Sequence, residues 1–105
     1  MEIENIFQNI SIDKSKEEFI DILKSDNIRI ERIVSNGQSS KKDFWYCQEE
    51  NEFVLLLEGN AILEFESEEI SLSKGEYINI NAFTKHRIKY TSETVSTVWL
   101  AVFYK

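Results

Sequence analysis

Apolar residues from position 28 onward come in short runs separated by polar and turn-forming residues. One run, residues 53–57, has five apolar residues in succession, which is typical of a strand covered on both faces. Other apolar or alternating runs occupy residues 28–34, 44–46, 61–66, 70–72, 77–80, 86–90 and 97–104. This pattern predicts about seven to nine short strands, and therefore an all-β sandwich or barrel.

One stretch before most of these strands has the pattern of a helix instead. Ser15 and Glu18 have the spacing of a capping box, in which each side chain bonds the backbone amide at the other's position. Phe19, Ile22 and Leu23 follow at the spacing of one helical face. We therefore expect one short N-terminal helix, over residues 16–24.

Length and charge restrict the classes of protein to which the chain can belong. At 105 residues we expect one domain over residues 1–105, with no room for a second core. Nineteen acidic against twelve basic residues give a net charge of −7, which argues against nucleic-acid binding. No apolar run is long enough to cross a membrane, and the N-terminus lacks the pattern of a signal peptide. With Cys47 as the lone cysteine, we expect a cytoplasmic protein.

The first candidate for chemistry is a carboxylate at the start of the most apolar strand. Because side chains alternate along a strand, Glu52 shares one face with Val54 and Leu56, so it would point toward the core. The alternative is a charged strand end that reaches back to water, since ionised carboxylates are seldom buried without a partner.

The spacing of three residue types over residues 37–90 resembles the cupins, a family of small β-barrels with jelly-roll topology. The first cupin motif ends in a glutamate, six residues and a glycine, which here are Glu52 and Gly59. The second begins with a glycine and ends with a histidine, here Gly75 and His86 at the family's spacing. The resemblance implies a cupin jelly-roll barrel, with Glu52 and His86 brought together inside it.

The chain departs from the family in both motifs. Asn81 stands where proline is usual in the second motif, and Phe83 stands where glycine is usual. The paired histidines that precede the glutamate are missing, and their positions fall on Tyr46 and Gln48 in one spacing, or on Trp45 and Cys47 in the other.

These departures leave a reduced set of metal ligands. The resemblance implies a divalent metal such as zinc, iron or manganese, held here by Gln48, Glu52 and His86, with Cys47 as the alternative to Gln48. A one-residue shift in register decides which of those two side chains faces inward. One imidazole makes a poorer site than the family's three histidines and glutamate.

A histidine and a carboxylate also form a functional pair without a metal. A carboxylate beside His86 would raise the imidazole pKa and fix its tautomer, giving a proton shuttle or an anchor for a polar ligand. The alternative is an internal hydrogen bond left behind by a lost metal site. Four aromatic residues are candidates for lining such a pocket or for core packing: Trp45, Tyr46, Phe83 and Tyr90.

An apolar outer surface predicts a homodimer. Small cupins commonly pair through their outer sheet, and the outward residues Phe53, Leu55 and Leu57, together with Ile6 and Phe7, would supply the contact.

Two functions follow from these features. The first is a small barrel that binds a small molecule or a divalent metal in its interior, without catalysing a reaction. The second is a metal-dependent oxygenase or isomerase that uses Gln48, Glu52 and His86, or an acid-base catalyst that uses Glu52 and His86 alone.

Overall fold

A computed structural model describes residues 1–105, which form eight β-strands and no helix. Seven of the strands lie where the apolar runs predict them. The strands are β1 (Glu18–Lys24), β2 (Ile28–Ser35), β3 (Asn51–Glu58), β4 (Asn60–Phe65), β5 (Glu69–Ser73), β6 (Tyr77–Ile80), β7 (His86–Thr91) and β8 (Thr97–Tyr104). Since the structure contains no helix at all, it has no helix that is long and apolar enough to span a membrane.

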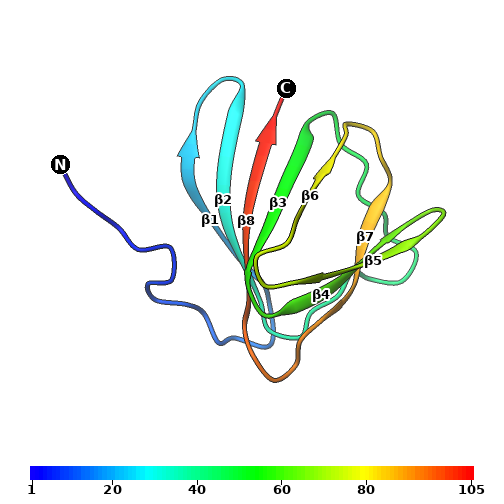
Figure 1. The fold of residues 1–105 in the computed structure, drawn as a ribbon, viewed down its shortest axis with the longest axis horizontal. Coiled ribbons are helices and arrows are strands. Elements are labelled where there is room, and N and C mark those ends of the chain that lie inside the picture. The colour runs from blue at the N-terminus through cyan, green and yellow to red at the C-terminus, as the bar shows by residue number, and fades with distance from the viewer.

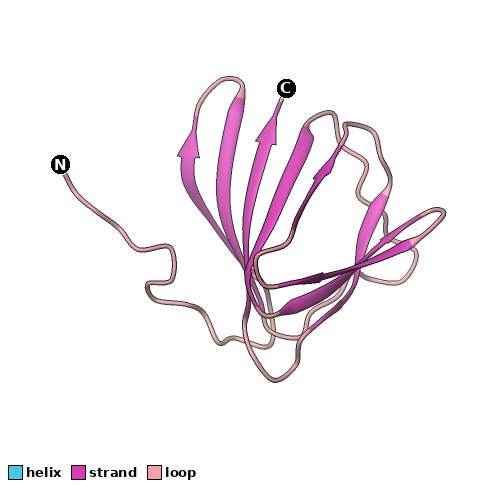
Figure 2. Cartoon of the chain, viewed as in Figure 1, coloured by secondary structure: helices cyan, strands magenta, loops and turns pink.

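The strands form two antiparallel sheets that face each other. The larger sheet has the order β1-β2-β8-β3-β6 and the smaller one β5-β4-β7 (Figure 1). The last strand along the chain, β8, lies in the middle of the larger sheet and pairs with β2 on one side and β3 on the other. Loops alone connect the strands, and the two sheets diverge toward one end of the molecule (Figure 2). The prediction of an all-β fold is confirmed.

The predicted N-terminal helix is wrong, because most of its residues form the edge strand β1. The capping box does not form: Ser15 bonds Asp13, while Glu18 makes an ion pair of 2.6 Å with Arg32. Backbone pairing with β2 replaces the helical hydrogen bonds, with a register shift between Asp21 and Leu23. Tertiary pairing therefore overrides the local signal.

The core lies between the sheets and follows the alternation of side chains along the strands. From the larger sheet, Val54, Leu56 and Trp99 point inward, and from the smaller sheet Leu63 and Leu72 meet them. The side chains that point outward from β3 are half-buried, so only one face of this strand is fully covered.

The turn between β3 and β4 requires a glycine. Gly59 has a φ of +88°, a backbone conformation that L side chains rarely adopt. A Cβ atom there would lie 2.5 Å from Oγ1 and 2.6 Å from Cα of Thr97, the fully buried first residue of β8. Position 59 of this chain thus needs a glycine because β8 passes directly against the turn.

Candidate functional site

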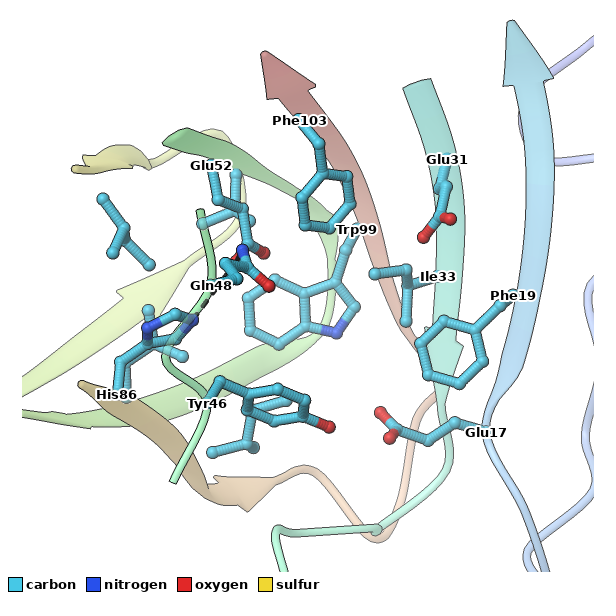
Figure 3. Close-up of a pocket in the computed structure, with 14 residues that line it drawn as sticks. Glu17, Phe19, Glu31, Ile33, Tyr46, Gln48, Glu52, His86, Trp99 and Phe103 are labelled. Carbon is cyan, nitrogen blue, oxygen red and sulfur yellow. Dashed lines mark hydrogen bonds and ion pairs between the residues drawn. The ribbon is translucent and has the colours of Figure 1, made fainter. Parts of the chain in front are cut away.

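A cavity of about 100 Å³ lies between the two sheets, with Glu52 and His86 on its wall (Figure 3). Most of its lining is apolar or aromatic, and it holds three carboxylates but no lysine or arginine. The lining residues are Glu17, Phe19, Glu31, Ile33, Tyr46, Gln48, Glu52, Val54, Leu63, Ile80, His86, Ile88, Trp99 and Phe103. A mainly apolar pocket with a few convergent polar groups has the general form of a small-molecule site.

The segment before β3 is held across the pocket by backbone hydrogen bonds to the second motif. The amide of Tyr46 donates to the carbonyl of His86 at 2.8 Å, and the amide of His86 donates back at 3.0 Å. The amide of Phe83 donates to the carbonyl of Gln48 at 2.8 Å. Of the residues 44–46 that the sequence predicts as extended, only Tyr46 therefore pairs with another strand.

The imidazole of His86 is buried and has a partner at each nitrogen. Nδ1 lies 2.8 Å from the carbonyl oxygen of Thr84, and Nε2 lies 3.2 Å from Oε1 of Glu52. A carbonyl oxygen only accepts, so Nδ1 carries a proton in every state of this pair. Nε2 and the carboxylate then share one further proton, which the pair can donate or accept at the pocket.

Opposing effects act on the protonation of His86. Burial disfavours the charged imidazole and lowers its pKa. The hydrogen bond to Glu52, the hydrogen bond to the Thr84 carbonyl and the charge of Glu52 act the other way and outweigh it, so the pKa of His86 is raised. The contacts with Glu52 and Thr84 thus stabilise the imidazolium more than burial destabilises it.

The register around residues 47 and 48 places the amide side chain in the pocket. Gln48 lines the cavity, and its Nε2 donates to Oε1 of Glu52 at 3.0 Å. Cys47 is exposed instead, and its thiol lies 3.6 Å from the carbonyl oxygen of Phe83. Three of the predicted ligand residues, Gln48, Glu52 and His86, are therefore brought together, while Cys47 is kept apart from them.

This donor set does not fit the four-ligand metal centre of the family. No group of three or more His, Cys, Asp or Glu side chains converges anywhere in the chain. Only Nε2 of His86 and the Glu52 carboxylate are strong donors, and Gln48 adds a neutral amide. The site is two imidazoles short of the family's centre, because Tyr46 and Gln48 occupy those positions.

Of the four aromatic residues predicted to line a pocket, only Tyr46 does so, and its ring stacks on His86 with centroids 5.8 Å apart. Trp45 packs against Arg87, while Phe83 and Tyr90 are exposed. The aromatic rings that do line the cavity are Tyr46, Phe19, Trp99 and Phe103.

Sequence reasoning missed several of these lining residues. Trp99 and Phe103 lie two positions either side of the fully buried Ala101 on β8 and so share its inward face. Assigning that face from the sequence would have identified them. Glu31 could have been found in the same way, since it shares its face of β2 with Ile33. No local signal marks Glu17, which precedes β1 and reaches the cavity only through the fold.

Comparisons with known proteins agree with this geometry. Residues 32–103 match the family model of the cupin domain. A protein of Ralstonia eutropha described as a "putative mannose-6-phosphate isomerase" has a similar crystal structure, with a TM-score of 0.96 and 32% identity, over 100% of this chain and 99% of that one.

More distant structures share the fold. A protein of Thermus thermophilus has a TM-score of 0.81 at 21% identity, covering 99% of this chain and 97% of that one. A cupin superfamily protein of Desulfitobacterium hafniense has a TM-score of 0.76 at 18% identity, covering 90% and 83%. No curated protein sequence matches the chain. With the family model spanning most of its length, the chain belongs to the cupin family, in which it keeps the glutamate and the second-motif histidine but not the paired histidines.

Proposed function

We propose that this protein is a cupin barrel that binds a small molecule in its interior, with the Glu52 and His86 pair as the polar anchor. One observation carries the proposal: an oriented imidazole and a carboxylate meet on the wall of a mainly apolar cavity. The pair offers a donor or an acceptor according to where its shared proton resides, and the apolar wall supplies contact area.

The name of the Ralstonia protein suggests a phosphorylated sugar as substrate, but the pocket gives this suggestion no support. Phosphate groups are held by arginine, lysine or backbone amides, and no lysine or arginine lines the cavity. Three carboxylates face the space instead, and they would repel a phosphate.

The second candidate is the metal-dependent oxygenase or isomerase. It is favoured by the convergence of Gln48, Glu52 and His86, and opposed by the shortage of strong donors. Metal content shows whether this donor set is used as a metal site, which the enzyme requires.

Two measurements on the same samples test the proposal. The wild type and His86→Ala are purified without an affinity tag or chelator, and a library of small metabolites is screened by thermal shift. Compounds that raise the melting temperature of the wild type should fail to do so with His86→Ala. Equal shifts in both proteins would place binding elsewhere and overturn the proposal.

Elemental analysis of the two samples tests for a metal centre. Metal well below one equivalent in the wild type agrees with a barrel that binds a small molecule without a metal. Near-stoichiometric zinc, iron or manganese that disappears in His86→Ala would instead establish a metal centre, and oxygen-dependent assays would then separate a metal-binding barrel from the enzyme candidate.

We also propose a homodimer formed through the outer face of the larger sheet. Phe53, Leu55, Leu100 and Val102 are half-buried neighbours on that face, in register across β3 and β8. Tyr77 beside them is 66% exposed and packs on Phe53. A continuous apolar surface on a sheet is suited to a two-fold contact with a second copy. The lone exposed cysteine fits a reducing compartment, so we place the protein in the cytoplasm.

A further inference from the structure

One carboxylate in the pocket is positioned by a chain of buried hydrogen bonds. The indole Nε1 of Trp99 donates to Oγ of Ser35 at 3.2 Å, and Oγ of Ser35 donates to Oε2 of Glu17 at 2.5 Å. Ser35 is fully buried and Trp99 nearly so. The carboxylate of Glu17 is thus oriented from inside the protein, and it points toward the hydroxyl of Tyr46 (Figure 3).

The charges around the cavity do not balance. Glu52 faces His86, and Glu31 pairs with Arg29 at 3.1 Å. Glu17 makes no ion pair within the chain, and its partner Ser35 is neutral. One negative charge on the pocket wall is therefore left without a counter-ion.

The pKa values of two groups on the cavity wall, Tyr46 and Glu31, are also affected by this excess of negative charge. Burial raises the pKa of Tyr46, and the charges of Glu17 and Glu52 raise it further. Burial also raises the pKa of Glu31, and Arg29 only partly offsets the rise. The carboxylates thus make the potential in this space negative, and a negative potential attracts cations.

The rest of the wall suits an apolar body attached to such a cation. Phe19, Ile33 and Trp99 lie beside Glu17 on the same side of the cavity (Figure 3). Aromatic faces attract alkyl groups by apolar contact and ammonium groups by cation–π interaction.

We propose that the ligand is a small organic monocation, an alkylamine in its ammonium form, whose charged group pairs with Glu17 and whose apolar part lies against Phe19 and Trp99. This inference rests on the proposed function, because it names the class of molecule that the barrel takes. The Glu52 and His86 pair, at the other side of the cavity (Figure 3), then meets the far end of the ligand.

The test compares three probes of nearly equal size: butylamine, which is an ammonium ion at neutral pH, neutral 1-butanol and anionic butyrate. Binding is followed by NMR at the indole N–H of Trp99, because this group donates to the serine that holds Glu17. The two indole signals are assigned with Trp45→Phe. The variant Glu17→Gln removes the charge but keeps an oxygen that accepts from Ser35, and Glu68→Gln makes the same charge change on an exposed turn residue.

Butylamine should shift the Trp99 signal saturably, and 1-butanol and butyrate should bind about tenfold or more weakly than butylamine. Glu17→Gln should lower the affinity for butylamine about tenfold, whereas Glu68→Gln should leave that affinity unchanged. Equal affinity for butylamine and 1-butanol, or for butylamine in the wild type and Glu17→Gln, would overturn the cation inference but leave the binding barrel standing. No response to any probe at millimolar concentration would also overturn the inference, and the screen with His86→Ala would still decide the proposed function.

Discussion

Of the three positive-φ glycines, Gly59 and Gly75 make a matched pair for testing how the first cupin motif works. Gly59 has a φ of +88° and Gly75 a φ of +87°, so alanine costs the same backbone strain at either site. The surroundings differ: a Cβ atom at Gly75 meets nothing within 4 Å, whereas at Gly59 it meets Oγ1, Cα and Cβ of Thr97 at 2.5, 2.6 and 2.9 Å.

The expected free energies follow from these contacts. A left-handed conformation costs an L residue about 1–2 kcal/mol, and the lost freedom of the unfolded glycine returns about 0.4–1 kcal/mol. Gly75→Ala should therefore lower the free energy of unfolding by about 1 kcal/mol. Gly59→Ala adds a steric clash with a buried strand that cannot move aside, worth about 1–3 kcal/mol or more. We expect a total loss of about 2–4 kcal/mol for Gly59→Ala.

Thermal and urea unfolding followed by circular dichroism measure both variants against the wild type. For a chain of this size the expected losses correspond to about 5 °C in melting temperature for Gly75→Ala and about 10–20 °C for Gly59→Ala. If the two variants lost equal stability, the contact with Thr97 would carry no cost. The explanation of the motif glycine by the passage of β8 would then be refuted.

Three further predictions test other parts of the structure. Phe83 is 68% exposed with a φ of 64°, so Phe83→Gly should relieve strain and raise the free energy of unfolding by about 0.5–1 kcal/mol; a lower melting temperature would contradict this. Because the pKa of His86 is raised on folding, its contribution to stability is complete below the unfolded value of 6.5 and is lost as pH rises through the folded pKa. Urea unfolding across this pH range should show that loss of unfolding free energy in the wild type and not in His86→Gln, which has no imidazole; an equal loss in both proteins would contradict the assignment. Light scattering should give a dimeric mass for the wild type and a monomeric one for Leu100→Glu, and a monomeric wild type at micromolar concentration would end the dimer proposal.

The strand pattern was predictable from the sequence because most strands have one buried and one more exposed face. The run that contains Val54 and Leu56, and the turn glycine after it, identify β3 and its inward side without a structure. The N-terminal edge strand was not predictable in this way. Residues 15–23 carry a cap pattern and helical spacing, and only the partner strand, through Glu18 and Arg32, decides the outcome.

The candidate site was predictable only in its centre. The spacing of two cupin motifs points to Glu52 and His86, whose strands belong to different sheets. The aromatic candidates lie near these motifs in the sequence, and sequence proximity does not tell which side of a loop a ring occupies. Phe83 illustrates this, because its left-handed backbone directs it to solvent although it lies three positions before His86. Glu17 was missed because a long-range hydrogen bond, not a motif, brings it to the pocket.

The central place of β8 has a consequence for how the protein is made. β2 and β3 have no hydrogen-bonded contact with each other, and the strand that joins them is synthesised last. While the ribosome is still translating, the growing chain can close β4 on β5 and β7, but β2 and β3 each lack a neighbour on one side. Nascent chains that stall before Thr97 thus expose unpaired apolar edges, and these are the species that a chaperone or a protease would encounter.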